Sequence, residues 1–311
     1  MKKVVVGLFI ISCLILAGCS QQNGAAAPEK TINIGVMPDV ESVPFVIADK
    51  NGYFEKEGVK VNIEHFKSAR DRDSALQSGK LDGVVSDFLA IAFANEGGFN
   101  LKIISKSNGN IKLLAGKDSN INAVYDLKGK KIGMSLNTVM EYTTDKMLQA
   151  NNINPDDIDK VAIPQLPTRL EMLQNGKIDA AILPDPLAGL AVINGARVLS
   201  STDELTNNSV AIAFTEKSIQ ENSQEIKAVF TAYNKAVNYL QNEPAESYID
   251  YIIEEQGFPV GIKESIILPH YDNAKLPDEN VFLDVIQWLK GKNLIKANYE
   301  YRDLVDDTIL R

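Results

Sequence analysis

The sequence predicts an α/β protein of two lobes, each a mainly parallel β-sheet with flanking helices, joined by two crossover strands. Two observations lead to this prediction. Strand-like and helix-like segments alternate through residues 31–214, and a motif that begins at Leu76 recurs at Leu173, 97 residues later. Such alternation is typical of a parallel sheet covered by helices. A repeat of this length is too long for one unit of a solenoid, so each copy should form a whole lobe.

Three pairs of segments carry the repeat in the same chain order. The motif LQSGKLDG over residues 76–83 recurs as LQNGKIDA over residues 173–180. The strand-like segments 32–36 and 61–64 recur at 130–134 and 160–163. Three matches at nearly one offset indicate a duplicated unit.

The pattern of apolar residues places the elements of the first copy. We expect strands over 32–36, 59–65 and 83–86, with helices over 45–56 and 70–78 between them. Helix-ending glycines and the spacing of N-terminal capping boxes support the second helix of each copy. The residues concerned are Gly79, Gly176, Ser68 with Asp71, and Thr168 with Glu171.

The remaining segments complete the two lobes. Apolar stretches over 111–115 and 210–214 flank the second copy and should carry the chain between the lobes. After residue 214, apolar residues recur at helical spacing and predict helices that cover a core. We assign residues 31–114 and 210–311 to the first lobe, and residues 115–209 to the second.

The first 30 residues have the layout of an exported protein. Lys2 and Lys3 precede an apolar run over 4–18 that is too short to span a membrane and is typical of a signal peptide. The run ends in Leu-Ala-Gly before Cys19, which resembles a bacterial lipobox. We therefore expect residues 1–18 to be removed, Cys19 to carry acyl chains, and residues 19–30 to tether the body to the cell membrane, facing outside or the periplasm.

Composition and charge argue against several classes of function. The formal net charge of -9 disfavours nucleic acid as a partner. Cys13 would leave with the signal peptide and Cys19 would be acylated, so thiol chemistry and disulfides are not expected. His65 and His270 have no catalytic motif beside them, and the phosphate-binding patterns GxGxxG and GxxxxGK are absent from the sequence. We expect no catalysis, no metal and no cofactor.

The loops that follow the predicted strands are the candidate binding site. Ligands of open α/β sheets bind beyond the carboxyl ends of the strands, and two facing lobes form a cleft there. Hydroxyl and carboxylate groups in these loops could contact a solute or could cap a helix, and both readings stay open. Residues with this double reading are Ser42, Asp87, Thr138 with Glu141, and Asp185. Arg169 and Arg70 could clamp a carboxylate or sulfonate or could simply be solvated.

At these residues the chain resembles a known family. The lipobox, GYFEKEGVKVNIEHF, LQSGKLDGVVSDFLA, DLKGKKIGMSLNTVMEYTTDKML and LQNGKIDAAILPDPLAGLA resemble substrate-binding lipoproteins of ABC importers, in the nitrate, taurine and alkanesulfonate, and thiamine-precursor binding family. The resemblance spans residues 31–311. It implies a type II periplasmic-binding fold whose lobes close on a solute and are then recognised by the importer's membrane subunits, and we expect the protein to be a monomer.

The resemblance and the loop analysis together give one set of candidate ligand-binding residues. The resemblance adds Tyr142 and points to the loop after Val36, the turn at residues 86–87, the helix start at residues 137–138 and the loop at Asp185. The full set is Asp39, Glu41, Ser42, Ser86, Asp87, Asn137, Thr138, Glu141, Tyr142, Arg169 and Asp185.

The charge of these loops bears on the identity of the solute. Carboxylates outnumber the two arginines, which disfavours a small inorganic anion such as nitrate. A solute that resembles an aminopyrimidine or thiamine precursor fits this balance, and a sulfonate or taurine-like solute remains the alternative. Two rival functions stay open: an enzyme of the same fold that acts on a pyrimidine-type metabolite, and a lipoprotein scaffold or sensor without a transport role.

Overall fold

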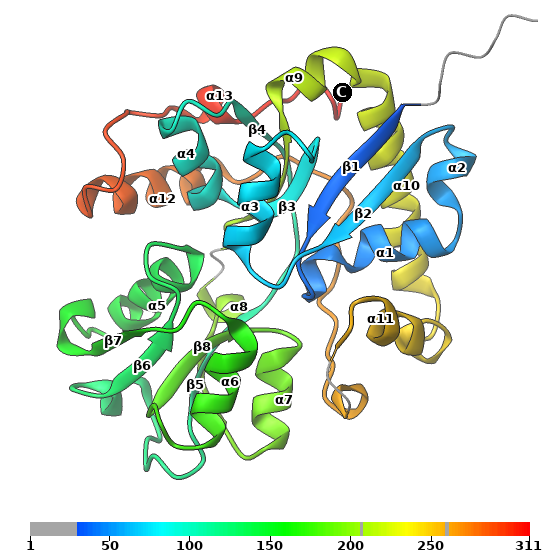
Figure 1. Cartoon of the computed structure of the whole chain (residues 1–311). Coiled ribbons are helices and arrows are strands. Elements are labelled where there is room, and N and C mark those ends of the chain that lie inside the picture. The colour runs from blue at the N-terminus through cyan, green and yellow to red at the C-terminus, as the bar shows by residue number, and fades with distance from the viewer. Residues whose placement is uncertain (1–29, 206–207, 259–260) are drawn as a thin grey trace, which may run out of the picture.

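The chain forms two lobes, each built on a five-stranded sheet (Figure 1). The computed structural model describes residues 30–205, 208–258 and 261–311. The expected signal peptide, the lipidation site at Cys19 and the tether up to residue 29 lie outside these ranges. Within them, no helix is both long enough and apolar enough to cross a membrane.

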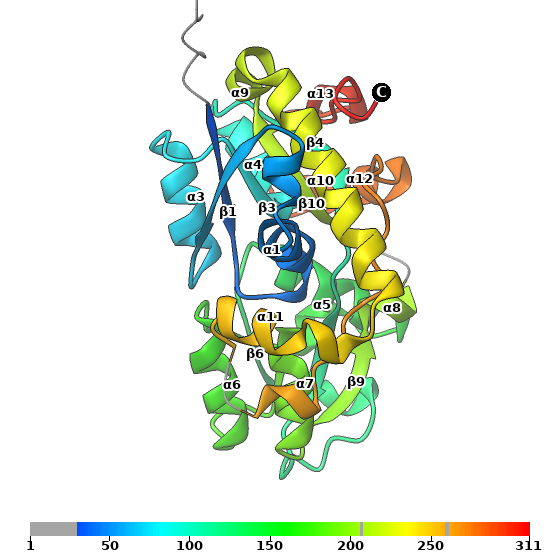
Figure 2. The same cartoon turned by 90° about the vertical axis from the view of Figure 1, so that its right-hand side faces the viewer.

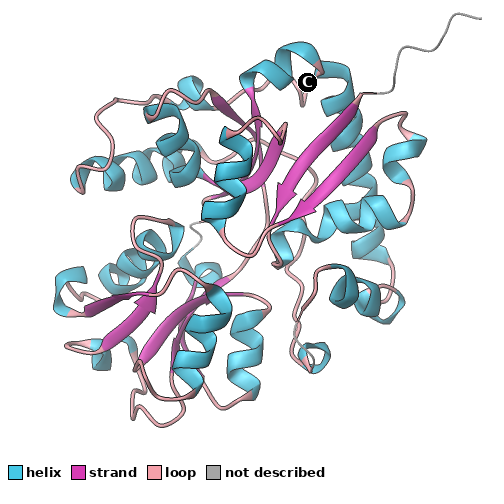
Figure 3. Ribbon diagram, viewed as in Figure 1, coloured by secondary structure: helices cyan, strands magenta, loops and turns pink. Residues whose placement is uncertain are grey.

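Both sheets have the same topology, as the repeat predicts (Figure 3). In the first, the strand order is β2-β1-β3-β10-β4, and in the second it is β7-β6-β8-β5-β9. Only the fourth strand of each order, β10 or β5, runs antiparallel to its neighbours, so the prediction of mainly parallel sheets is confirmed. The strands are β1 (Thr31–Val36), β2 (Lys60–His65), β3 (Gly83–Asp87), β4 (Leu101–Lys106), β5 (Ile111–Ala115), β6 (Lys131–Met134), β7 (Asp159–Ala162), β8 (Ala180–Pro184), β9 (Arg197–Ser201) and β10 (Val210–Thr215).

Helices cover both faces of the first sheet. Two separate apolar cores result: one lies under α1, α10 and α11, and the other under α3, α4 and α12. Figure 2 shows α10 running along one side of the lobe. The helices of this lobe are α1 (Val43–Lys50), α2 (Tyr53–Lys56), α3 (Ala69–Gln77), α4 (Phe88–Glu96), α9 (Glu216–Glu221), α10 (Ser223–Asn242), α11 (Ile249–Glu255), α12 (Glu279–Gly291) and α13 (Tyr301–Leu304).

The second lobe repeats this plan on a smaller scale. Its helices are α5 (Val139–Ala150), α6 (Leu166–Gln174), α7 (Leu187–Ile193) and α8 (Thr202–Leu205). Short 3-10 turns complete the fold: η1 (Val40–Ser42), η2 (Val124–Leu127), η3 (Pro155–Asp157), η4 (Ala245–Ser247) and η5 (Ile262–Glu264).

Two predicted helices differ from the structure for local reasons. The helix expected over 45–56 is divided into α1 and α2 because Gly52 adopts a left-handed backbone with φ of 62°. The second helix of the second lobe begins at Leu166, so Thr168 does not cap it; Pro167 sits in its first turn, where a missing N–H costs nothing. In contrast, Ser68 caps α3 as predicted, by accepting a hydrogen bond from the Asp71 N–H.

The chain crosses between the lobes earlier than we expected. β5 lies entirely in the second sheet, where Ile111 and Leu113 pack with Ile132 and Ile182. The first crossing is therefore at residues 107–110 rather than near residue 114. The Asn208 amide donates to the Ser107 carbonyl at 2.9 Å and the Ser107 N–H donates to the Val210 carbonyl at 3.1 Å, so the first crossing lies beside the residues that lead into β10.

The close approach of β3 to Phe214 gives a testable prediction. A Cβ atom at Gly83 would lie 2.7 Å from two ring carbons of Phe214, which is fully buried on the neighbouring strand β10. Gly83→Ala should therefore lower the free energy of unfolding by about 1–3 kcal/mol, the usual cost of overpacking. The measurement is urea unfolding of the purified protein. Gly291→Ala is the matched control, because a Cβ atom there meets nothing within 4 Å; equal stability of the two variants would contradict the prediction.

Candidate functional site

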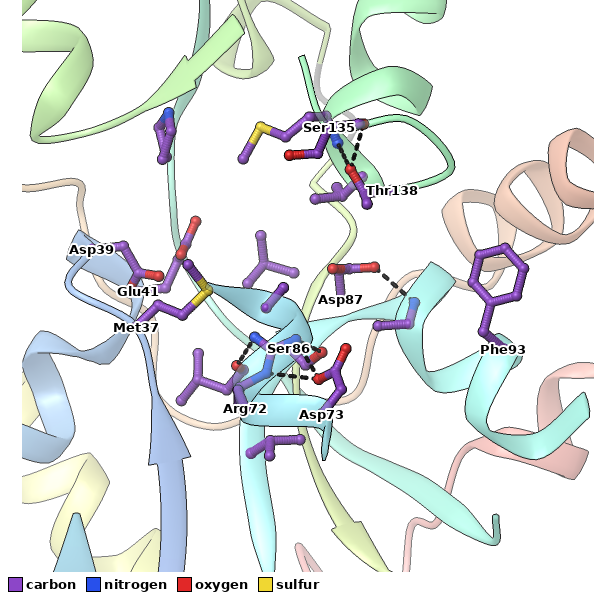
Figure 4. Close-up of a pocket in the computed structure, with 18 of the residues that line it drawn as sticks. Met37, Asp39, Glu41, Arg72, Asp73, Ser86, Asp87, Phe93, Ser135 and Thr138 are labelled. Atoms are coloured by element: carbon purple, nitrogen blue, oxygen red, sulfur yellow. Dashed lines mark hydrogen bonds and ion pairs between the residues drawn. The ribbon is translucent and has the colours of Figure 1, made fainter. Parts of the chain in front are cut away.

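A pocket of about 250 Å³ lies between the lobes, at the carboxyl ends of the sheet strands (Figure 4). The sequence analysis predicted this location. Residues from both lobes line the pocket, and six of the candidate binding residues are among them: Asp39, Glu41, Ser86, Asp87, Asn137 and Thr138. The other five, Ser42, Glu141, Tyr142, Arg169 and Asp185, lie outside its lining.

The loop after β1 brings two carboxyl groups to the pocket. Asp39 caps η1, since its Oδ1 accepts hydrogen bonds from the N–H and the hydroxyl of Ser42 at 3.3 and 3.2 Å. Burial raises the pKa of Asp39. Burial also raises the pKa of Glu41 well above its ordinary value, and the neighbouring Asp39 charge adds to the increase.

Contacts from distant parts of the first lobe fix this loop. The Gln256 amide donates to the Ser42 hydroxyl at 2.6 Å, and the Tyr271 hydroxyl donates to the Val40 carbonyl at 2.7 Å. Ser107, at the crossing to the second lobe, donates to the Glu41 carbonyl at 3.2 Å. Ser42 therefore holds the loop in place through its contact with Gln256 and does not line the pocket.

The Glu41 side chain rests on the crossing segment itself. A Cβ atom at Gly109 would overlap the Glu41 carboxyl group as it lies, so a larger residue there would require the Glu41 side chain to move. Glu41 thus lines the pocket and touches the chain at the point where the lobes are joined.

Asp87 ends β3 and caps α4. Its Oδ1 accepts a hydrogen bond from the Ala90 N–H at 2.9 Å. Burial raises the pKa of Asp87 to about 6, although the Ala90 N–H and the Arg72 charge act in the opposite direction. The cap predicted from the sequence is present, and the side chain still lines the pocket.

Arg72, the counterpart of Arg169 in the other lobe, was not among the residues predicted from the sequence. Arg72 donates to the Val85 carbonyl at 2.7 Å and the Ser86 hydroxyl at 2.9 Å, and its guanidinium lies 2.8 Å from the Asp73 carboxylate. Arg70, which the sequence offered beside Arg169 as a possible anion clamp, is exposed on α3. The repeat offset of 97 residues points to Arg72 instead, and that offset was the signal that could have identified it.

Arg169 is buried and performs the same structural role in the second lobe. It donates to the Ile182 carbonyl at 2.7 Å, to the Ile163 carbonyl at 2.9 Å and to the Ser135 hydroxyl at 2.5 Å. Burial lowers the pKa of this guanidinium to about 10. Because it is fully enclosed, Arg169 supports the pocket wall through Ser135 rather than offering a clamp for an anion.

The second lobe contributes the start of α5 to the pocket. Asn137 adopts a left-handed backbone with φ of 58°, and Thr138 caps the helix by accepting from the Met140 N–H at 3.2 Å. Glu141 reaches back and accepts from the Asn137 N–H at 2.7 Å. Of the two readings left open for Glu141, the capping one is present in the structure.

Glu141 also lies in an ion-pair network that joins the lobes. It binds the ammonium groups of Lys160, from its own lobe, and Lys292, from the first lobe, at 2.9 and 2.6 Å. Burial opposes its ionisation, but the Asn137 N–H and the two lysines outweigh burial and lower the pKa of Glu141 to about 2. Asp145 accepts from the Trp288 indole of the first lobe at 3.0 Å.

Tyr142 belongs to the same contact between the lobes. Its hydroxyl donates to Asp284 of α12 at 2.6 Å, and its ring packs edge-on against Trp288 with centroids 5.6 Å apart. Asp185, at the end of β8, is paired with Lys112 of β5 at 2.6 Å. The sequence spacing gave no sign of the partners Asp284, Trp288 and Lys112, because they are distant in the chain.

Comparisons with known proteins place this geometry in a family. A family model described as "NMT1/THI5 like" matches residues 39–247. A putative aliphatic sulfonates-binding protein of Bacillus subtilis is 28% identical, over 100% of this chain and 96% of the relative. A putative ABC transporter periplasmic binding protein of Brachyspira hyodysenteriae is 27% identical over 78% of this chain and 75% of its own length. A putative thiamine biosynthesis protein of Haemophilus influenzae is 24% identical over 84% of this chain and 85% of its own length.

Solved structures agree on the fold. The periplasmic aliphatic sulphonate binding protein of Escherichia coli superposes with a TM-score of 0.76 at 20% identity, over 90% of this chain and 93% of that one. The alkanesulfonate-binding protein of Xanthomonas axonopodis pv. citri, bound to MOPS, also has a TM-score of 0.76. It is 19% identical, over 91% of this chain and 100% of that one. The type II periplasmic-binding fold expected from the sequence is confirmed.

The ion pairs of Glu141 give a pH-dependent prediction. Glu141→Gln should lower the free energy of unfolding at pH 7 by about 1.5–3 kcal/mol, the value of a hydrogen bond to a charged group. Its folded pKa lies below the ordinary value, so the stabilisation is complete above the ordinary pKa of 4.5 and is lost as the pH falls through about 2. Urea unfolding of the natural protein and the variant, at several pH values from 7 down to about 2, measures the difference in stability.

The control for this variant is Glu171→Gln on the exposed face of α6. It should leave the free energy of unfolding unchanged at every pH. A Glu141→Gln deficit that stays constant as the solution is acidified would show that the carboxylate charge is not its cause.

Proposed function

Because this chain belongs to the NMT1/THI5-like family, we propose that it is an extracytoplasmic solute-binding protein that captures a small organic solute between its lobes and delivers it to an ABC importer. One observation carries the proposal: the pocket lies between the two lobes and is lined by polar groups of both, with Asp39, Glu41 and Asp87 from one lobe and Asn137 and Thr138 from the other. A solute there would contact both lobes at once.

Such a solute would act by stabilising the closed arrangement of the lobes. Ligands shift a conformational equilibrium by their differential affinity for its states, and hinge closure is the common form of this change. The crossing at residues 107–110 supplies the hinge. The closed surface would then be the feature that the importer's membrane subunits recognise, and no covalent step is required.

The names of the relatives suggest two classes of solute. One relative is named for aliphatic sulfonates and another for thiamine biosynthesis. A sulfonate or taurine-like compound and an aminopyrimidine or thiamine precursor are therefore the solutes to test. We also propose that acyl chains on Cys19 hold the protein on the outer surface of the cell membrane, where it acts as a monomer.

A co-purified solute would test the binding function. Full-length protein extracted from membranes in mild detergent should release a small molecule on denaturation, detected by comparing native and denaturing mass spectra. Ala90 lines the pocket, so Ala90→Trp should fill it and abolish the adduct. Ala150→Trp, on the exposed end of α5, should retain it. A chemically altered product instead of a bound solute would favour an enzyme, and a stable protein partner with no adduct would favour a scaffold.

The lipid anchor has a separate test. Cys19→Ala should move the protein from the membrane fraction to the soluble fraction, because acyl chains contribute about 0.8 kcal/mol per buried CH₂ and are lost with the thiol. Cell fractionation with immunoblotting measures this distribution. Cys13→Ala, inside the apolar run, is the matched control and should stay with the membrane. Membrane retention of Cys19→Ala would remove the lipoprotein assignment.

A further inference from the structure

Two helix starts that face the pocket, those of α4 and α5, are already occupied by the chain's own side chains, whereas the start of α6 at Leu166 has no side-chain cap. Free N–H groups at the start of a helix are a common site for anions. Here Asp87 accepts from the Ala90 N–H at 2.9 Å at the start of α4. At the start of α5, Thr138 accepts from Met140, and Glu141 accepts from Asn137. An anionic solute would have to displace a carboxylate from either position.

The positively charged side chain that lines the pocket, Arg72, already has partners within the first lobe. Arg72 is the sole basic residue among the described residues that line the pocket. Its guanidinium donates to the Val85 carbonyl and the Ser86 hydroxyl and pairs with the Asp73 carboxylate. A guanidinium group has five N–H donors, and these contacts direct most of them into the first lobe.

Among the described residues, three of the four carboxyl groups that line the pocket form no ion pair, whereas Asp73 pairs with Arg72. Within the described part of the chain, no lysine or arginine lies within ion-pair distance of Asp39, Glu41 or Asp87. All three are at least nine-tenths buried, with Glu41 only 8% exposed. A charge at such a depth is costly, so a buried carboxyl group either keeps its proton or is joined by a cation. Burial accordingly raises the pKa of all three groups, although the Arg72 charge acts in the opposite direction.

Apolar residues of both lobes also line the pocket and could hold the body of a small organic molecule. Met37 and Phe93 from the first lobe and Leu166 from the second line the pocket. Figure 4 shows Asp39, Glu41 and Met37 together on one side, Asp87 nearer the centre, and Phe93 beyond it. Asp39 and Glu41 therefore lie beside an apolar side chain, in a pocket that uncharged polar residues also line.

We propose that the solute is an organic cation whose protonated amine or amidine lies against Glu41 and Asp87, while its apolar body lies between Met37, Phe93 and Leu166. This inference rests on the proposed solute-binding function and names the charge class of the solute. It excludes a sulfonate as the preferred ligand, although similar proteins are named for sulfonates.

The ionisation of the carboxyl groups predicts how affinity depends on pH. Burial raises the pKa of Asp87 to about 6, and the charged or titratable groups near it are Arg72 and Asp73 of α3 and Glu41 of η1. A cation binds the ionised carboxylate, so its affinity should rise with pH through about 6. One carboxyl group with a pKa of about 6 should make the affinity for a cation about tenfold higher at about pH 7 than at about pH 5. An anion would show the opposite trend.

The test uses benzamidine and benzenesulfonate, two probes with the same ring and opposite fixed charges. Isothermal titration of the full-length protein in detergent, freed of bound solute, measures both affinities at about pH 5 and pH 7. Benzamidine should bind, and bind about tenfold more tightly at the higher pH. Glu41→Gln, which preserves shape, should weaken it at least about tenfold, and the exposed Glu171→Gln should leave it unchanged.

Tighter binding of benzenesulfonate, affinity for benzamidine that falls with rising pH, or no binding of either probe would each overturn the inference. The co-purified solute separates this failure from failure of the proposed function. An anionic solute in the mass spectrum would leave a solute-binding protein with the wrong charge class assigned, whereas the lack of any solute would count against the binding function itself.

Discussion

The pocket depends on two buried guanidinium groups, one in each lobe. Arg72 and Arg169 donate to the carbonyls of Val85 and Ile182, which occupy equivalent positions in the strands β3 and β8. A buried guanidinium must satisfy its donors, and in both lobes it donates to a backbone carbonyl within the central strand and to a serine hydroxyl near a strand end. This requirement fixes the strand ends in place, and the loops that follow them form the pocket.

The same arrangement explains why Arg169 cannot act as an anion clamp. Its N–H groups donate hydrogen bonds to the carbonyls of Ile163 and Ile182 and to the Ser135 hydroxyl, all within the lobe. Arg72 differs in having an acidic neighbour, Asp73, and in lining the pocket. Duplication therefore preserved the supporting contacts in both lobes, while the side chains around them diverged enough to give one lobe an acidic surface.

Contacts between the lobes divide into two kinds. Near the hinge, Glu41 rests against Gly109, so the side chain that faces the pocket also touches the crossing segment. Farther away, α5 and α12 meet through Glu141 with Lys292 and through Tyr142 with Asp284. The side chains of the second set lie outside the pocket lining, but Glu141 also accepts a hydrogen bond from Asn137, which lines the pocket. Both sets of contacts between the lobes therefore include or touch residues of the pocket.

The sequence by itself determined the architecture and the location of the pocket. Alternation and duplication predict two parallel-stranded lobes, and strand-end loops must then face one another. Six candidate residues line the pocket for this reason, although their contact with a solute stays a prediction. Local spacing also identified the caps at Asp87 and Thr138, because a cap depends only on residues within one helical turn.

Only the tertiary structure decided what each polar side chain does beyond its own loop. Glu141 and Tyr142 look like pocket residues in the sequence, yet their partners Lys292 and Asp284 lie some 140–150 residues away. Arg72 and Arg169 look like surface residues until the sheet closes over them. Whether a charged group faces solvent, a partner or a cavity depends on desolvation and on neighbours brought together by folding, and neither can be read from local spacing.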